Sequence, residues 1–232
     1  MHDTDAFGQP VGPVVAGWTP RPRPPRAAMA GRLCRLEPLD PDRHADDLHA
    51  AFAADHEGRM WAYMAYGPFP TPEDYRRWAG RAAANEDPQF FTILDRDGAC
   101  GVASFLRIDP ANGVIEIGHI AFAPRLQRTA AATEALFLMM RRAFDELGYR
   151  RLEWKCNALN AASRRAAERL GFTYEGVFRQ AVVVKGRNRD TAWFAIIDAD
   201  WPAIQQGFER WLSPDNFDAD GRQRRSLAAC RG

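Results

Sequence analysis

The stretch Val114-Ile115-Glu116-Ile117-Gly118-His119-Ile120-Ala121-Phe122, together with residues 124–135 after it, decides the fold. The first segment is apolar and β-branched, which predicts a strand. Beyond it, apolar residues recur at helical spacing: Ala132, Ala135, Leu136, Met139, Met140, Ala143, Phe144 and Leu147. The turn between them, residues 124–129, lies where phosphates commonly bind, because the first N–H groups of a helix have no partner inside it. Such turns are usually rich in glycine and this one has none, so a phosphate site and a plain connection both remain open.

The rest of the chain also alternates between predicted strands and helices. The strands are predicted at 32–39, 90–94, 101–108, 114–122, 151–156, 181–184 and 191–197, and the helices at 40–54, 71–85, 132–147, 160–170 and 201–212. Asp40-Pro41 and Thr71-Pro72 pair an N-cap residue with a first-turn proline. Hairpins come first and one helix joins the two middle strands, so the order predicts an α+β fold with a mixed sheet.

Composition excludes several classes of protein. The chain has 232 residues, of which 46% are hydrophobic, and this is enough for one domain with a substantial core. A net charge of +1 gives no general attraction to nucleic acid or to anionic membranes. No apolar run approaches the roughly 20 residues that span a bilayer, and the acidic N-terminus is unlike a signal peptide. The scattered Cys34, Cys100, Cys156 and Cys230 show no metal-ligand spacing, so we expect a cytoplasmic protein without a metal.

Three regions are expected along the chain. Residues 1–30 are rich in glycine and proline and predict an extended arm laid over the domain with Trp18 as an anchor, or alternatively a proline-rich ligand for a partner. Residues 31–200 form the α+β domain. Residues 201–232 contain a helix and a basic tail, which we expect to be solvated from Arg222 onward.

Three local segments point to a known family. They are residues 115–120 followed by 132–136, the run Asn160-Ala161-Ala162-Ser163, and residues 170–176 with 187–190. They resemble, in turn, the central strand with its acetyl-CoA helix, the Asn-x-x-Ser segment and the C-terminal hairpin of the GNAT superfamily of N-acetyltransferases. The closest resemblance is to the branch of ribosomal-protein N-terminal acetyltransferases. It implies a mostly antiparallel seven-stranded sheet flanked by about four helices plus a C-terminal helix, with acetyl-CoA as cosubstrate.

The family's pyrophosphate turn reads Arg/Gln-x-x-Gly-x-Gly/Ala, and residues 125–130 match it here. Arg128 stands where the first glycine is expected. A left-handed arginine would cost about 1–2 kcal/mol, so we predict that Arg128 has helical backbone angles and begins the helix. The turn would then bind coenzyme A through Arg125, Arg128, Thr129, Ala130, Ala131 and Ala132. The alternative is a plain helix start with exposed arginines.

Glu116 and His119 are the candidate bases. An amine with a pKa near 10.4 must lose a proton before it attacks. By the resemblance, both residues lie on the strand beside the thioester. Residues three apart point to opposite faces of a regular strand, so only a bulge would bring them together. Pairing with an arginine is the alternative for Glu116, and a hydrogen-bonded core histidine is the alternative for His119.

The resemblance also implies groups for the remaining steps. Backbone N–H groups near Ile120, Ala121 and Phe122 would stabilise the oxyanion. Asn160 would hold the pantetheine, and Ser163 would protonate the departing thiolate. Many family members use a tyrosine for that last step, and Ala167 stands at its position here. Helix capping explains Asn160 and Ser163 as well.

The segment between the first two helices is dense in aromatic residues. Trp61, Tyr63, Tyr66 and Phe69 are candidates for the amine site, with ordinary core packing as the alternative. The histidines His44, His49 and His56 fit no metal-ligand spacing, and we interpret them as part of a solvated helix face.

Two functions follow from these patterns. The first is acetyl transfer from acetyl-CoA to a primary amine, either a small molecule or a peptide N-terminus, by direct attack in a ternary complex. The second is a non-catalytic acyl-CoA sensor, which the missing glycine and the missing tyrosine favour. A homodimer through the strand after Ala181 and the C-terminal helix is a further expectation.

Overall fold

The computed structural model describes residues 3–231, so the expectations for Met1, His2 and Gly232 lie outside the described residues. The strands are β1 (Asp3–Thr4), β2 (Pro10–Val11), β3 (Met29–Ala30), β4 (Arg35–Pro38), β5 (Gln89–Asp95), β6 (Gly98–Asp109), β7 (Val114–Phe122), β8 (Arg151–Asn157), β9 (Thr173–Val184) and β10 (Arg187–Ile197). The α-helices are α1 (Pro41–Ala53), α2 (Pro72–Ala84), α3 (Ala130–Arg141), α4 (Ala161–Leu170), α5 (Trp201–Leu212) and α6 (Leu227–Arg231). Two 3-10 turns, η1 (Arg59–Trp61) and η3 (Pro214–Asn216), and a π-helical turn, η2 (Arg142–Glu146), complete the list.

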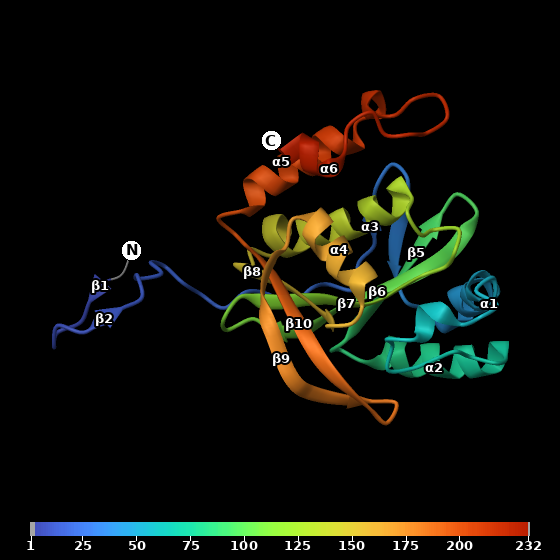
Figure 1. Ribbon diagram of the computed structural model, residues 1–232, viewed down its shortest axis with the longest axis horizontal. Helices are drawn as coiled ribbons and strands as arrows, with labels where there is room; N and C mark the ends of the chain where they lie inside the picture. The colour runs from blue at the N-terminus through green and yellow to red at the C-terminus, as the bar shows by residue number, and fades with distance from the viewer. Residues whose placement is uncertain (1–2, 232) are drawn as a thin grey trace.

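The main sheet has eight strands in the order β3-β4-β5-β6-β7-β8-β10-β9 (Figure 1). All neighbours are antiparallel except β7 and β8, which are parallel and are joined by the crossover through α3. The prediction of an α+β fold with a mostly antiparallel sheet is confirmed. The eighth strand is the short edge strand β3, which pairs with β4 and adds to the seven that the sequence predicts.

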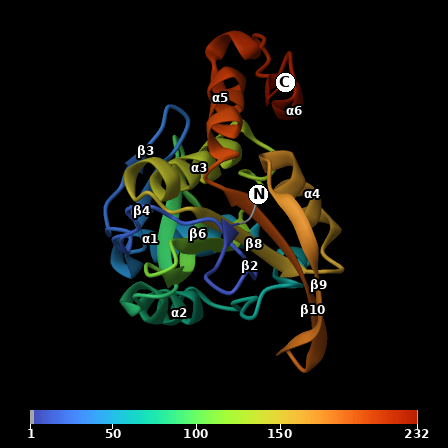
Figure 2. The ribbon, with the colours of Figure 1, turned by 90° about the vertical axis from the view of Figure 1, so that its left-hand side faces the viewer.

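Helices cover both faces of the sheet (Figures 1 and 2). One apolar core lies under α3 and α5 and contains Phe105, Ile117 and Phe208. The other lies under α1 and α2 and contains Leu48 and Trp78. The side chains of Asp40 and Thr71 cap α1 and α2, as their sequence positions predict.

A buried carboxylate explains why β4 begins later than predicted. Glu134, on α3, accepts the backbone N–H groups of Arg32, Leu33 and Cys34 at 3.0, 2.6 and 2.9 Å. These three donors therefore bond to a side chain rather than to a strand, and the β4 ladder starts only at Arg35. Burial, followed by the neighbouring Glu134, raises the pKa of the Cys34 thiol well above its ordinary range.

Trp18 anchors the N-terminal arm, as predicted. Its indole N–H donates to the carbonyl of Ala111 at 2.9 Å, and the guanidinium of Arg21 lies 4.5 Å from its ring centre. Further along, the buried Arg142 donates to the carbonyls of Ala27 and Ala28. The β1–β2 hairpin precedes these anchors and projects away from the domain (Figure 1).

The C-terminal tail is only partly solvated, which corrects that prediction: residues 222–226 are exposed, but two apolar side chains of α6 are buried. Leu227 and Cys230 lie three apart on α6 and are each 1% exposed, because α6 packs against α5. In turn, α5 packs on α3, where the rings of Phe137 and Phe208 stack with centres 5.0 Å apart. The loop between η3 and α6 lies above the N-terminus of α3 (Figure 1).

Candidate active site

A cleft opens where the two parallel strands separate. The β7–β8 ladder ends at the pair Glu116–Glu153, although both strands continue, to Phe122 and Asn157 respectively. Each strand is hydrogen-bonded only on its outer side beyond that point, to β6 and to β10. The resulting cleft has a volume of about 1530 Å³ and is lined by η1, β6, β7, the start of α3, α4, the β9–β10 hairpin and the loop after α5.

One end of the cleft is the turn before α3, and here a prediction is wrong. Arg128 has a φ of 62°, so it is left-handed and does not begin the helix. The helix begins at Ala130, and Thr129 is the N-cap, whose hydroxyl accepts the Ala132 N–H at 3.1 Å. The chain reverses between Leu126 and Thr129, whose N–H donates to the Leu126 carbonyl. That reversal requires a left-handed residue, and arginine takes the conformation that glycine would adopt there.

The predicted phosphate ligands divide into two groups. Arg128, Thr129, Ala130 and Ala132 line the cleft. Ala131 lies outside the lining, although its N–H and that of Ala130 belong to the first helical turn and have no partner inside the helix.

Arg125 lies outside the cleft lining and has a structural role. Its guanidinium pairs with Asp95 and donates to the carbonyls of Gly98 and Ala99 at 3.2 and 3.0 Å. The first arginine of the turn therefore fastens it to the β5–β6 hairpin.

A bulge brings Glu116 and His119 to the same cleft. The register of β7 against β6 shifts between Gly118 and Ala121, and His119 has a φ of 52°. The extra residue rotates the strand, so that side chains three apart can share a face. Both Glu116 and His119 line the cleft.

Glu116 is buried and held by two cations. Its Oε2 lies 2.6 Å from a nitrogen of Arg107 and 3.0 Å from the Nζ of Lys155. Lys155 is itself buried and also pairs with Glu153 at 2.6 Å. These contacts indicate that Glu116 holds Arg107 and Lys155 in place at the cleft.

His119 is a neutral imidazole at the wall of the cleft. Burial, followed by the nearby Arg107 and Arg189, lowers its pKa to about 4. Its ring stacks on Tyr66 with centres 5.6 Å apart and packs beside Phe90. A neutral ring can accept a proton at pH 7, but it is a weak base.

Ser163 is oriented by two hydrogen bonds from opposite sides. Its N–H donates to the Asn160 side chain at 3.1 Å, which makes Asn160 the N-cap of α4. Its Oγ accepts the indole N–H of Trp154 at 3.0 Å. Because the oxygen already accepts, its own proton is available to a partner in the cleft, which both Asn160 and Ser163 line.

The family model of the GNAT acetyltransferase domain matches residues 33–173, which is more than half of the chain. The chain belongs to the GNAT acetyltransferase family. A crystal structure of a GCN5-related N-acetyltransferase from Brucella melitensis is 48% identical, with a TM-score of 0.92 over 94% of this chain and 99% of that chain. The ribosomal-protein-serine acetyltransferase of Escherichia coli is 32% identical over 112 residues, which are 48% of this chain and 62% of that protein.

YdaF of Bacillus subtilis, provisionally named a ribosomal N-acetyltransferase, is 26% identical over 172 residues, which are 72% of this chain and 90% of that protein. These relatives confirm the resemblance to the family and to its ribosomal-protein branch. Family membership makes this GNAT protein an acetyl-CoA-dependent acyltransferase.

Most of the predicted aromatic site is core in this GNAT protein. Trp61 is buried against Phe52 and Phe69, with ring centres 5.4 Å away in each case. Tyr66 lies among the same rings, and its buried hydroxyl has no hydrogen-bond partner among the described residues. Tyr63 is the member of the set that lines the cleft, and its hydroxyl donates to the Leu159 carbonyl at 3.2 Å.

One histidine of the first helix is buried, which corrects the expectation of a solvated face. The Nδ1 of His44 lies 3.1 Å from the Thr92 hydroxyl, and its Nε2 lies 3.4 Å from Glu37. Burial, followed by Arg43, lowers the pKa of His44.

Within residues 3–231, no three His, Cys, Asp or Glu side chains gather as metal ligands. None of the helices in that range is both long enough and apolar enough to cross a bilayer.

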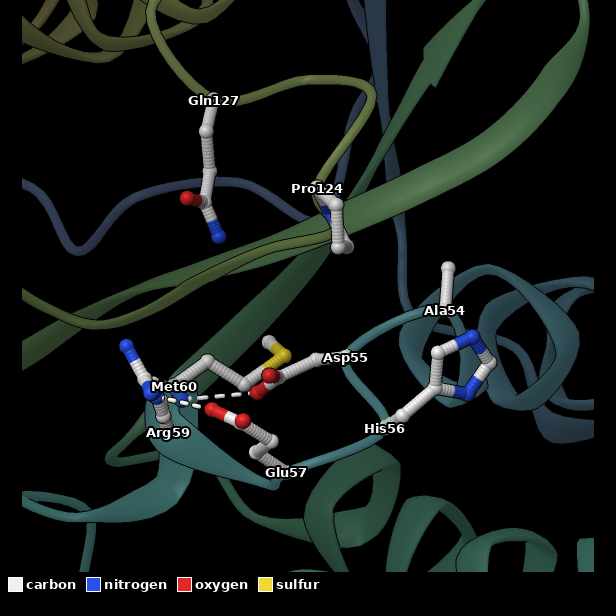
Figure 3. Close-up of a pocket in the computed structure, with 8 residues that line it drawn as sticks. All are labelled: Ala54, Asp55, His56, Glu57, Arg59, Met60, Pro124 and Gln127. Carbon is white, nitrogen blue, oxygen red and sulfur yellow. Dashed lines mark hydrogen bonds and ion pairs between the residues drawn. The ribbon is translucent and has the colours of Figure 1, made fainter.

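A smaller pocket of about 620 Å³ adjoins the cleft (Figure 3). It is lined by Ala54, Asp55, His56, Glu57, Arg59, Met60, Pro124 and Gln127. The carboxylate of Asp55 accepts the Met60 N–H at 2.8 Å, and Glu57 pairs with Arg59. Its acidic side chains therefore have partners within the loop that carries them, and we assign the pocket no ligand.

The sequence missed several charged groups of the cleft. Arg107 lies near the end of β6, Lys155 lies on β8 and Arg189 lies on β10, so no local spacing connects them. At the other end, Arg165 and Arg169 on α4 meet Arg222 from the C-terminal loop. Lys155 offered the one available signal, since an isolated lysine within an apolar strand needs a buried partner.

Proposed function

We propose that acetyl-CoA lies along the cleft and that the protein transfers its acetyl group to a primary amine. The observation that carries this is the end of the β7–β8 ladder at Glu116–Glu153. Beyond it, two strand edges offer backbone donors and acceptors to the amides of a pantetheine chain. The cleft continues from these edges to the free N–H groups at the start of α3.

The charge of the cleft fits the phosphates of coenzyme A. Eight basic side chains line it, against Glu116 as the one acidic side chain among the described residues of the lining. Arg128, Arg165, Arg169 and Arg222 lie toward the end formed by α3 and α4. The dipole of α3 adds a partial positive charge at the same place. Guanidinium groups and helix N–H groups are the donors that phosphates prefer.

The C-terminal region contributes to this end of the site. Trp211 and Phe217 line the cleft together with residues 221–223. Arg169, on α4, donates to the Thr133 hydroxyl, and its guanidinium lies 5.1 Å from the Trp211 ring centre. We therefore propose that residues 201–231 complete the cofactor site of the 31–200 domain, whereas the described part of the arm, residues 3–30, lies outside it.

The thioester supplies an activated acetyl carbon, and the chain's groups act around it. In this proposal, N–H groups of β7 near Ile120–Phe122 bind the oxyanion as the amine nitrogen bonds to that carbon. The proton lost by the amine passes to the neutral His119 or to water. As the carbon–sulfur bond breaks, the Ser163 hydroxyl, which Trp154 positions, gives its proton to the departing sulfur and regains one from water. The products are the N-acetyl amine and the free thiol.

Two measurements test the proposal. Calorimetry with acetyl-CoA is expected to show binding, and thiol release with a panel of primary amines is expected to show turnover. Binding without turnover on any amine would favour the acyl-CoA sensor. Absence of binding would overturn the assignment of the cleft.

We also propose a homodimer through β9, with a second copy as the partner. β9 is an edge strand of the sheet, and its side chains are mostly exposed, Val183 by 76%. An exposed apolar edge is a template for pairing with another strand. Val183→Lys is expected to convert a dimer to a monomer in sedimentation velocity, and a wild-type monomer would reject the proposal.

The four cysteines are unpaired, which supports a reducing cytoplasm as the protein's location.

A further inference from the structure

The amine-binding end of the cleft is apolar with a cationic patch. Its apolar lining is formed by Met60, Met64, Leu106, Phe178, Val182 and Trp193. Arg107, Lys155 and Arg189 lie among them. The mixture indicates a ligand that is apolar in one part and charged in another.

Arg189 lacks a partner for a buried atom. Its Nε is buried and has no hydrogen-bond partner among the described residues. Burial is the largest cause that lowers the pKa of Arg189, and the nearby Arg107 lowers it further. The adjacent Asp190 does not neutralise it, because its carboxylate accepts from the Gln180 N–H and the Asn188 side chain. An unpaired, half-buried guanidinium is costly unless a ligand completes it.

The surrounding ion pairs leave one positive charge in excess. Glu116 binds Arg107 and Lys155, and Lys155 also binds Glu153. At the edge of this group, Arg151 pairs with Glu153 and with Glu175. The cations of this network together with Arg189 number four, and the carboxylates number three.

The ammonium group of Lys155 is held in one position. The Lys155 side chain is 3% exposed, and its Nζ lies 3.8 Å from the centre of the Trp193 ring. The cation–π contact and the two carboxylates fix it in the floor of the cleft. The excess charge of this group therefore falls on Arg189, which has no carboxylate partner among the described residues.

We propose that the acceptor is an apolar α-amino acid, whose carboxylate binds Arg189 while its amine faces the thioester. This inference rests on the proposed transfer of an acetyl group in the cleft. Arg189 lines the cleft together with Glu116 and Cys156. It lies two residues before Thr191, which pairs with Asn157 on the part of β8 beyond the point where β7 and β8 separate. A carboxylate bound to Arg189 would lie near the reacting amine. This arrangement fits an α-amino acid, in which the carboxylate and the amine are attached to the same carbon. A guanidinium can bind a carboxylate through two parallel hydrogen bonds.

The experiment compares acceptors that differ in one group. L-Phenylalanine, L-phenylalaninamide and 2-phenylethylamine are assayed for thiol release with acetyl-CoA, and for binding to the coenzyme A complex by calorimetry. The amino acid is expected to have kcat/KM at least about tenfold above the other two, mainly through KM, because a charge-assisted hydrogen bond contributes about 1.5–3 kcal/mol. Arg189→Gln is expected to abolish this preference, and Arg189→Lys to keep part of it. Arg187→Gln, which removes an exposed charge from the same hairpin, is the matched control.

The outcomes separate this inference from the proposed function. Carboxylate-dependent binding that Arg189→Gln removes would support the inference even without turnover, in which case acetyl transfer itself would be in error. Equal or better binding and acetylation of the amide or the plain amine would overturn the inference and leave the acetyltransferase intact. A peptide with an amidated C-terminus that is acetylated in preference to the amino acid would overturn it too. Thermal unfolding of each variant establishes that it is folded.

Discussion

The two ends of the cleft are built in different ways. At the proposed phosphate end, the expected binding groups are the backbone N–H groups of one continuous segment between Arg128 and Ala132, joined by arginines of α4 and of the C-terminal loop. At the amine end, Glu116, Lys155 and Arg189 come from three strands that the topology brings together. The first end keeps its backbone geometry when glycine is replaced by arginine. The second depends on each charge having its partner, so single substitutions there are expected to cost more.

The largest effect is expected from Glu116→Gln. This change leaves the buried Lys155 with Glu153 alone and leaves Arg107 without a countercharge. Removing one partner of a buried pair costs about 3–5 kcal/mol, and we expect about 3 kcal/mol because Lys155 keeps Glu153. Urea denaturation measures the free energy of unfolding. Glu175→Gln is the control, since Glu175 is 40% exposed and its loss is expected to cost less than about 1 kcal/mol. Equal losses in the two variants would contradict the view that the amine end depends on paired charges.

Ser163→Ala is expected to have the next largest effect. The hydroxyl that the Trp154 indole orients is lost, while the backbone N–H that Asn160 accepts remains. We expect kcat to fall by about 10–100-fold with little change in the KM of acetyl-CoA, because the hydroxyl acts on the departing sulfur. Steady-state thiol release measures both constants.

Ser163→Thr, which keeps a hydroxyl, is expected to recover part of that rate. A change in KM alone would indicate that Ser163 serves only as part of the α4 cap. In that case the start of α4 would resemble the start of α3, where the residues that cap the helix are also the residues proposed to bind the ligand.

The sequence predicted the fold well because most helices and strands have signals within their own residues, such as an N-cap or a regular spacing of apolar side chains. The N-caps at Asp40 and Thr71 and the apolar period of α3 correspond to elements that the structure contains. The first half of β9 was missed because its side chains are mostly exposed and show no buried alternation. The tail was predicted wrongly because α6 has only two buried apolar residues, Leu227 and Cys230. Their burial depends on packing against α5, which the local sequence does not indicate.

The parts of the site that lie within one short segment of sequence could be predicted, and the parts that come from distant segments could not. The turn, the bulged strand and the Asn160–Ser163 pair lie within short segments, and the structure places them together. The conformation of Arg128 was predicted wrongly because the energy cost of a left-handed residue is smaller than the benefit of a closed turn and a Thr129 cap. Arg189 could not be found, since its position at the cleft depends on the pairing of β8 with β10.

A smaller effect is expected at Arg128, where backbone and side chain can be separated. Arg128→Ala removes the charge and keeps the strained φ of 62°, whereas Arg128→Gly removes both. Both variants are expected to weaken acetyl-CoA binding by up to about tenfold, or about 1.4 kcal/mol, and to leave the reaction of S-acetylpantetheine, which has no pyrophosphate, unchanged. Only the glycine variant is expected to gain stability, by about 1 kcal/mol. A loss with both donors would show that Arg128 shapes the cleft rather than binding phosphate.

The smallest effect concerns His119, which connects the two ends through the bulge in β7. Its pKa of about 4 lies below the ordinary value of 6.5, so between these values the unfolded chain binds more protons than the folded protein. Stability contributed by the neutral ring is therefore present above about pH 6.5 and falls toward pH 4, by about 1.2 kcal/mol between pH 7 and pH 5.5. His119→Asn removes this dependence and still tolerates a φ of 52°.

Urea denaturation at several pH values is expected to show a shallower decline for the variant than for the wild type. The same imidazole is neutral throughout pH 6–9, so kcat/KM of both proteins is expected to follow the deprotonation of the amine without an inflection near 6.5. An inflection at that pH in the wild type alone would mean that His119 is charged in the free enzyme. The bulge would then hold a cation, and the amine end of the cleft would contain a second excess charge beside Arg189.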